Sequence, residues 1–318
     1  MEVIDTKRTA SVIAVLLIVS TALFASAGSE STVGGLDTIP QRIIALDPFT
    51  FEAMVALEAP IIATSRIYIE EFLQKFPEYE EQLQSVVRLE LPADPEILLS
   101  LEPDAILGRR TAIEGSLRRL SRIAPTVVFA NESSADWQES AAFFAAAIGM
   151  TTEFDLLDSR FRDRLALLQI DLRRRYGDDL PTVSLLRIMP GRLRLYFTKS
   201  FAGIVIDGAG LSHPDHQQEL IDRSGRGASL YNLSLEELRL ADADYVFAYT
   251  TEGLGDDEAQ RYLNEVREQS LWASLDAVKN NRVFIVENNW FAAGYIAADA
   301  IIDDLYQHIL DTGASALP

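Results

Sequence analysis

Arginine and aromatic side chains follow several short apolar stretches of this sequence, and their types suit the binding of an anionic ligand. Guanidinium groups donate paired hydrogen bonds to carboxylate oxygens, and aromatic rings cover the apolar parts of a ligand. We interpret the apolar stretches as buried strands of parallel sheets, whose carboxyl ends form the edge where ligands bind. The candidates at that edge, with Tyr196 on a strand that can reach it, are Arg66, Arg109, Arg110, Arg187, Tyr196, Tyr249 and Trp290.

Several of these candidates also have an ordinary structural explanation. Arg109 and Arg110 are adjacent, so we expect at least one of them to point to solvent. Arg187 directly follows a buried strand, where a charge without a partner is unfavourable, and this position favours a binding role. Trp290 can equally cap the hydrophobic core.

The sequence offers little for nucleophilic or metal chemistry. It has no cysteine, which excludes thiolate nucleophiles, Cys-ligated zinc and iron–sulfur clusters. It contains no G-x-S-x-G motif, no P-loop and no dinucleotide glycine motif. His213 and His216 are three residues apart, with Asp215 and Glu219 nearby, but Pro214 interrupts the pair and indicates a solvated loop. We therefore predict no catalytic residue and no metal site.

Two acidic pairs recur 140 residues apart and indicate a duplicated unit. Glu96 precedes Asp104 by eight residues, and Glu236 precedes Asp244 by the same number. Each aspartate leads into a short apolar strand, and each strand leads into a polar loop. A repeat at this distance is too long for a solenoid, so it predicts two related α/β lobes whose loops face one cleft.

Strands and helices alternate along most of the chain, as in parallel sheets covered by helices. Within residues 153–177, apolar residues recur at spacings of three and four, which predicts one long helix. We favour a connector over a surface helix of a single large domain, because strand alternation restarts after it. The predicted fold is α/β, with two Rossmann-like lobes of mainly parallel sheets, one long bridging α-helix and a ligand cleft between the lobes. The N-terminal lobe is expected at residues 37–152 and the C-terminal lobe at residues 178–318.

The first 27 residues have the pattern of a secretory signal peptide. A modest basic region precedes a thirteen-residue apolar core at residues 12–24, which is short for a membrane span. Ala25–Ala27 matches an A-x-A cleavage site, and residues 28–36 resemble a flexible Gly/Ser linker. The alternative is an uncleaved amino-terminal anchor. In either case we expect the mature part of the chain outside the cytoplasm.

The net charge of −20 argues against a nucleic-acid partner, which would require a basic face. The hydrophobic share of 48% is sufficient for sizeable cores in a chain of 318 residues. The charge itself indicates solubility and does not specify a fold.

Five segments in order resemble the siderophore/cobalamin type of periplasmic solute-binding protein, which delivers its ligand to an ABC importer. They span residues 40–310, nearly the whole mature chain, and the PGRLRLYF portion most resembles the branch that binds iron(III)–siderophores or ferric citrate. The segments are PQRIIALDPFTFEAMVALEAPIIATS, DPEILLSLEPDAIL, VSLLRIMPGRLRLYFTKSFAGIVIDGAGL, LSLEELRLADADYVFAY and LWASLDAVKNNRVFIVENNW.

This resemblance implies a monomeric periplasmic protein that captures an iron(III)–siderophore of the hydroxamate or citrate type. It implies delivery to the permease dimer of an ABC transporter in the inner membrane, with Glu96 and Glu236 docking on permease arginines; a one-residue slip to Glu237 is the alternative. The iron arrives already chelated, so no cofactor of the protein is implied. Some relatives carry a ligand-contacting arginine near the position that Arg88 occupies in this sequence. We interpret Arg192 and Arg194 of this sequence as surface charges.

One departure from the family pattern concerns membrane attachment. Many relatives are lipoproteins with a cysteine after the signal, and here Gly28 follows Ala27, so a lipid tether is not expected. Linkage through an uncleaved signal remains open. Two other functions also remain open: a binding protein of the same fold for cobalamin or haem, where Tyr196 or Tyr249 could ligate haem iron, and an extracytoplasmic enzyme.

Overall fold

The computed structural model describes residues 36, 38–130, 133–223, 230–250, 257–286, 290, 292 and 294–310. These residues lie within one compact unit, Ser31–Pro318. The predicted signal peptide and all but the last residue of the predicted linker lie outside the described residues. Among the described helices, none combines the length and apolar character needed to cross a membrane.

The first sheet contains five parallel strands in the order β3-β2-β1-β4-β5. The strand order reverses between β1 and β4, which makes that pair the topological switch point, the usual ligand position in such sheets. The central strands are fully buried because helices cover both faces of a parallel sheet. The strands are β1 Ile43–Ala45, β2 Ile61–Ser65, β3 Val87–Leu89, β4 Ala105–Arg109 and β5 Thr126–Phe129.

Short helices connect the strands of this sheet. Asp47 fixes the start of the first helix, because its carboxylate accepts hydrogen bonds from the N–H groups of Phe49 and Thr50 at 3.1 and 3.0 Å. The α-helices are α1 Pro48–Ala56, α2 Arg66–Lys75, α3 Glu80–Leu83, α4 Pro95–Ser100, α5 Arg110–Ile113, α6 Leu117–Leu120 and α7 Trp137–Ala147. The 3₁₀ turns are η1 Pro77–Tyr79, η2 Glu114–Ser116 and η3 Ser134–Asp136.

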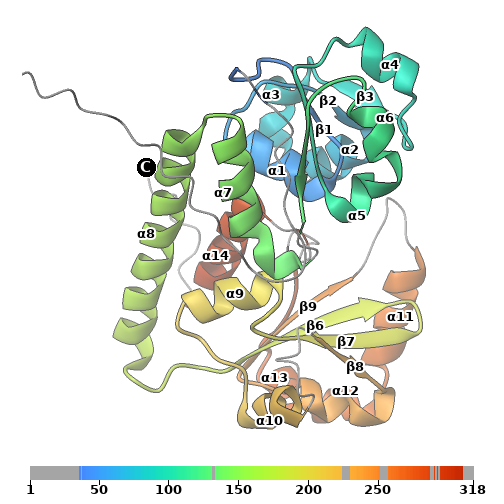
Figure 1. The fold of residues 1–318 in the computed structure, drawn as a ribbon. Coiled ribbons are helices and arrows are strands. Elements are labelled where there is room, and N and C mark those ends of the chain that lie inside the picture. Colours follow the sequence, from blue (N-terminus) through green and yellow to red (C-terminus); the bar gives the residue numbers. More distant parts are fainter. Residues whose placement is uncertain are drawn as a thin grey trace, which may run out of the picture. The chain divides into compact units, whose positions relative to one another are not determined.

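A single long helix, α8 (Thr151–Tyr176), separates the two sheets in the sequence. The apolar stripe had predicted a helix at residues 153–177. Gly177 follows the last turn with φ of +73°, a left-handed conformation that glycine adopts without strain. The helix packs beside α14 (Tyr295–Ile309), as Figure 1 shows. Buried residues of α8, α14 and both sheets belong to one hydrophobic cluster, so the core is continuous from one sheet to the other.

The second sheet is mixed, with the order β10-β9-β6-β7-β8. Its strands β6, β9 and β10 pair in parallel, whereas β7 is antiparallel to both β6 and β8. The predicted α/β class with mainly parallel sheets is therefore confirmed. The strands are β6 Val183–Met189, β7 Arg192–Tyr196, β8 Leu230–Leu233, β9 Tyr245–Thr250 and β10 Val283–Ile285.

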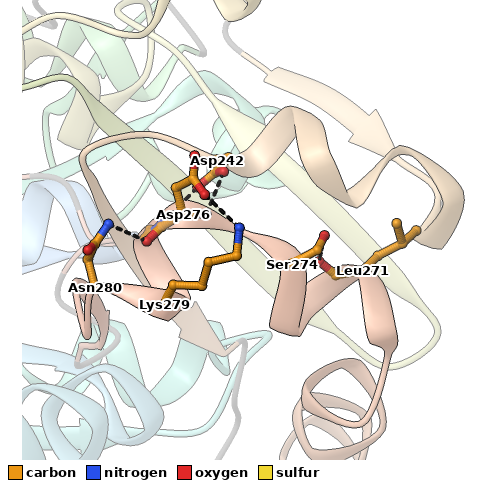
Figure 2. A network of polar contacts seen from close by, with 7 residues as sticks. Asp242, Leu271, Ser274, Asp276, Lys279 and Asn280 are labelled. Atoms are coloured by element: carbon orange, nitrogen blue, oxygen red, sulfur yellow. Dashed lines mark hydrogen bonds and ion pairs between the residues drawn. The ribbon is translucent and has the colours of Figure 1, made fainter.

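One helix beside the second sheet begins at a cap from a residue distant in the sequence. Two short helices, Ser270–Ser274 and Asp276–Lys279, are separated at Leu275. The division arises because Asp242 caps the second helix, accepting from the N–H groups of Asp276 and Ala277 at 2.7 and 3.0 Å (Figure 2). Lys279 pairs with the Asp276 carboxylate at 2.7 Å. The elements are α9 Phe201–Gly208, α10 Asp215–Arg223, η4 Leu235–Ala241, α11 Asp257–Arg267, α12 Ser270–Ser274 and α13 Asp276–Lys279.

The two aspartates of the sequence repeat have the same structural role. Asp104 precedes β4 and accepts the N–H of Gln41 at 2.8 Å, just before β1. Asp244 precedes β9 and accepts the N–H of Thr182 at 2.8 Å, just before β6. Because β1 pairs with β4 and β6 with β9, each aspartate ties together the starts of two adjacent parallel strands. The repeat thus marks an equivalent position in both sheets.

Candidate functional site

Two segments at the switch point of the first sheet meet around Asp47. Its carboxylate caps α1 and also accepts the backbone N–H of Arg109, the last residue of β4, at 2.8 Å. The Arg109 guanidinium lies over the Phe49 ring, 4.4 Å from the ring centroid. Its Nη2 also donates to the carbonyl of Ser133 at 3.1 Å. Cation–π stacking and these hydrogen bonds hold a buried arginine at the carboxyl edge of the sheet.

Asp47 serves this edge as an anchor for the protein's own backbone. Burial raises the pKa of the Asp47 carboxyl, although hydrogen bonds from Thr50 and Arg109 act to lower it. The Thr50 hydroxyl donates to the same oxygen that accepts from Arg109. Because both carboxylate oxygens already accept internal hydrogen bonds, Asp47 positions Arg109 and is not a candidate for ligand contact.

Arg66 and Arg110, also predicted at this edge, occupy different environments. Arg66 begins α2, and its guanidinium pairs with Glu70 at 2.8 Å and Glu90 at 2.7 Å. The hydrogen bonds that Arg66 donates to Glu90 and Glu70 raise its pKa, and the charges of these carboxylates neutralise much of its attraction for an anion. Arg110 begins α5 and is half-buried, whereas its neighbour Arg109 is buried.

Arg187, Tyr196 and Tyr249 come together on one face of the second sheet. Arg187 lies directly opposite Tyr249 in the parallel pair, and Tyr196 lies opposite Leu185, two residues before Arg187. Because side chains alternate along a strand, these positions share one face. Arg187 Nη1 donates to the Tyr196 hydroxyl at 2.9 Å, and the two tyrosine ring centroids are 6.2 Å apart. All three residues are buried, with Arg187 only 6% exposed.

Sequence reasoning missed Arg194 as a member of this group. In the antiparallel pair it lies directly opposite Arg187, so it shares the face with the two tyrosines. It is partly exposed, and its Nε donates to Asn232 at 2.9 Å. The signal was present in the alternation of RLRLYF, which places Arg194 and Tyr196 on one side of the strand.

Electrostatics make this face a set of hydrogen-bond donors. Burial raises the pKa of the Tyr249 hydroxyl well above its usual value, and the neighbouring Tyr196 adds to the effect, while Arg187 and Arg194 act to lower it. Tyr249 is therefore a neutral O–H donor at physiological pH. Two guanidinium groups beside two tyrosine hydroxyls suit the oxygens of an anionic chelate or carboxylate.

Three predicted exit-loop residues lie inside strands in the structure. Arg109 ends β4, Arg187 lies two residues before the end of β6, and Tyr249 lies one residue before the end of β9. Every residue of β4 and β6, and every residue of β9 except the last, is buried, so these polar side chains lie within covered parts of the strands. The backbone pairing continues beyond the apolar runs, and this corrects the predicted strand ends.

Trp290 lies in the hydrophobic core and not at an open edge. Its side chain is 1% exposed, and its ring stacks on Phe247 with centroids 4.6 Å apart. The indole N–H donates to the Asp304 carboxylate at 2.6 Å. This environment agrees with the alternative that Trp290 caps the hydrophobic core. We therefore do not include Trp290 in the proposed ligand site. The sequence also predicts an exit loop at Asn288–Trp290, and of these residues Asn288 and Asn289 lie outside the described residues.

The histidine pair has local structural partners. His213 is buried and its Nδ1 contacts the carbonyl of Val183 at 2.9 Å, while Nε2 of His216 contacts the carbonyl of Leu240 at 3.1 Å. Asp215, His216 and Glu219 lie in helix α10, which begins two residues after His213, so the prediction of a loop was wrong for these three residues. Within the described ranges, no group of three His, Asp or Glu side chains is arranged to hold a metal.

The two glutamates predicted to dock a partner are both exposed. Glu96 lies in the first turn of α4, which Asp94 caps, beside the exposed Ile97 and Leu99. Glu236 lies in the first turn of η4. The adjacent Glu237 is engaged internally, because its carboxylate accepts from the N–H and hydroxyl of Ser234 and from the Tyr231 hydroxyl. This difference favours Glu236 as the outward-facing carboxylate.

The sequence of this chain matches a known family model and is similar to several known proteins. The family model described as periplasmic binding protein matches residues 43–289. The chain is 29% identical over 294 residues to the probable siderophore-binding lipoprotein YfiY of Bacillus subtilis (strain 168), covering 89% of this chain and 87% of that protein. It is 26% identical to the achromobactin-binding periplasmic protein of Dickeya dadantii (strain 3937), covering 84% and 86%.

Solved structures show the same fold. The structure of Staphylococcus aureus SirA complexed with staphyloferrin B matches with a TM-score of 0.75 at 24% identity, covering 88% of this chain and 98% of that chain. A structure of FhuD2 from Staphylococcus aureus with bound ferrioxamine B matches with a TM-score of 0.67 at 18% identity. At these identities the structures establish the fold alone.

Proposed function

The chain belongs to the periplasmic binding protein family, and on that premise we propose that it captures an iron(III)–siderophore for an ABC importer. The proposed ligand class is a ferric chelate of the hydroxamate or citrate type. The relatives with the most similar sequences reported above are named for siderophore or achromobactin binding, and they span most of this chain. That shared length supports a whole-protein correspondence.

The observation that carries the proposal is the donor group Arg187, Tyr196 and Tyr249 with Arg194 beside it. A ferric chelate of this type presents many oxygen atoms and often a negative charge. Buried guanidinium and phenol donors bind such oxygens more strongly than exposed ones, because water competes less. Arg109 stacked on Phe49 supplies an equivalent cation at the switch point of the first sheet.

The proposed role is binding and delivery without catalysis, by a monomer outside the cytoplasm. The iron is part of the cargo, so the proposal requires no cofactor. The related proteins are named as binding proteins, which supports this reading. Incubation with a ferric chelate should return the chelate unchanged, and accumulation of a ligand fragment or of iron(II) would contradict it.

A titration with a ligand panel tests the proposal directly. Intrinsic tryptophan fluorescence of residues 28–318 is followed with ferric citrate, a citrate–hydroxamate chelate, a trihydroxamate, a ferric catecholate, cobalamin and haem. We expect saturable quenching by a hydroxamate or citrate chelate of iron(III), with the other ligands weaker by about tenfold or more. Saturable binding of cobalamin or haem alone would move the substrate class, and no saturable response from any member would reject the proposal.

We further propose that Glu96 and Glu236 dock the protein on arginines of the permease. Both carboxylates are exposed in the first turns of their helices, at positions that the repeat makes equivalent. A carboxylate–arginine pair can form two parallel hydrogen bonds, which fixes orientation as well as affinity.

Replacing both docking glutamates with alanine should reduce uptake and leave binding intact. In cells that lack the wild-type gene, the Glu96→Ala/Glu236→Ala protein should support iron-chelate uptake at about one tenth of the wild-type rate or lower, since two interfacial ion pairs are lost. Affinity of the purified protein for the chelate should stay within twofold. Glu265→Ala, an exposed glutamate of α11, is the matched control. Normal uptake by the double variant would exclude this docking role.

A further inference from the structure

A pocket of about 210 Å³ lies beside the switch point of the first sheet. Its walls are mainly aromatic and come from the start of α1 and from α2: Phe49, Phe51, Tyr68, Phe72 and Phe76. Phe72 packs edge-on against Phe51 with ring centroids 5.5 Å apart, and its centroid is 5.1 Å from that of Phe76. The pocket therefore has a packed aromatic wall.

The pocket adjoins the proposed ligand site through one side chain. Phe49 lines the pocket, and the same ring carries the Arg109 guanidinium 4.4 Å from its centroid. Phe49 and Tyr68 are both partly exposed, so the pocket wall reaches the surface at the carboxyl edge of the sheet. A molecule whose charged part contacts Arg109 could thus extend past Phe49 into the pocket.

Charge in the pocket selects against an anionic occupant. Two acidic residues, Glu52 and Glu71, and one basic residue, Lys75, belong to the lining, and Glu52 is buried. Its Oε1 accepts the N–H groups of Ile296 and Ala297, while Oε2 has no hydrogen-bond partner among the described residues. An acidic group would lose its hydration and meet two carboxyls but only one ammonium group, whereas an uncharged apolar group would gain from leaving water.

We propose that this pocket is a subsite for an uncharged apolar arm of the ferric chelate, such as a short acyl chain or an aromatic ring. The inference rests on the proposed function and adds the substrate class, a chelate with a polar iron-binding head and an apolar arm. At ~30 Å³ for each water-sized group, the pocket holds about seven such groups, which suits an arm of roughly six carbon atoms. Arg109 binds the head on one side of Phe49, and the aromatic wall encloses the arm on the other.

A matched pair of complexes tests the subsite. A linear trihydroxamate with a terminal amine is acylated with either an acetyl or a hexanoyl group, and a citrate–hydroxamate scaffold is treated in the same way; all four are loaded with iron(III). Each pair differs only by four methylene groups. On the scaffold that binds, the hexanoyl complex should bind about 100-fold tighter than the acetyl complex, with a more negative heat capacity change by calorimetry.

A variant that fills the pocket provides the second measurement. Ala292→Leu places a larger side chain in the lining, and it should abolish the hexanoyl advantage while the acetyl complex keeps its affinity within twofold. Ala273→Leu, an exposed alanine of α12, is the control and should leave the advantage unchanged.

The possible failures separate the two proposals. Equal affinities of the acetyl and hexanoyl complexes for the wild-type protein would overturn the subsite and leave the proposed function in place. An advantage that persists in Ala292→Leu would also overturn the subsite, because the arm would then bind elsewhere. Absence of saturable binding by all four complexes and by the wider panel would overturn the proposed function, and the subsite with it.

Discussion

Arg187→Ala should weaken binding of the ferric chelate by about 100-fold. The guanidinium is 6% exposed and holds the Tyr196 hydroxyl at 2.9 Å, so it is oriented before the ligand arrives. A hydrogen bond to a charged group contributes about 1.5–3 kcal/mol, and the upper end of that range corresponds to roughly two factors of ten in affinity. The dissociation constant is measured by fluorescence titration with the chelate that binds in the panel.

Two further variants make the Arg187 result specific. Arg187→Lys keeps the charge but loses the planar donor fork, so its affinity should fall between those of wild type and Arg187→Ala. Arg173→Ala removes an exposed arginine from the last turn of α8 and should stay within twofold of wild type. If Arg187→Ala unfolds at the wild-type urea concentration and still binds within threefold of wild type, Arg187 does not contact the ligand.

The free energy of unfolding of the wild-type protein should fall as pH rises, and Glu52→Gln should abolish this part of the pH dependence. Burial raises the pKa of Glu52 to about 7 in the folded protein, even though backbone hydrogen bonds from Ala297 and Ile296 lower it. Desolvation therefore outweighs the favourable position of the carboxylate at the start of α14.

The direction of the pH dependence follows from that raised pKa. The folded state holds the Glu52 proton more tightly than the unfolded chain, whose carboxyl has a pKa of about 4.3. Stability from the neutral carboxyl is thus fully present below that value and declines as pH rises towards 7. With about 1.4 kcal/mol for each unit of pKa difference, the total loss by pH 8 is on the order of 3 kcal/mol.

The comparison of urea unfolding at pH 5 and pH 8 measures this effect. The amide side chain introduced by Glu52→Gln keeps an oxygen that can accept from Ile296 and Ala297 but carries no titrating proton. Relative to wild type, Glu52→Gln should therefore gain about 2–3 kcal/mol between the two pH values. Glu265→Gln, an exposed glutamate, should show no such gain. Parallel pH profiles for wild type and Glu52→Gln would contradict the raised pKa.

The class of the fold and the long helix were accessible from the sequence because both depend on local periodicity. Residues 153–177 carry an apolar stripe at helical spacing, and the observed α8 is Thr151–Tyr176. Strand–helix alternation indicated parallel sheets, and the structure has an entirely parallel first sheet. The helices α2, α10 and α11 were not identified, although the buried Ala259, Leu263 and Val266 of α11 recur at helical spacing.

The limits of the site prediction are visible in two residues. Trp290 and Arg187 both follow or end apolar runs, yet Trp290 stacks on Phe247 in the core and Arg187 lies beside two tyrosines. Whether an aromatic residue after a strand covers the core or the ligand edge depends on which element packs over it. No local pattern contains that information.

The sequence by itself determined the class of fold, the duplicated acidic pairs and the residue types available for binding, because periodicity and composition act through neighbours along the chain. Only the tertiary structure decided the strand order that makes β1 and β4 the switch point, and the register that sets Arg187 opposite Tyr249 and Arg194. It also decided that the Glu52 carboxylate meets the start of α14, more than 240 residues away. Such pairings arise from the free energy of burying whole faces of sheets and helices, which depends on all elements together.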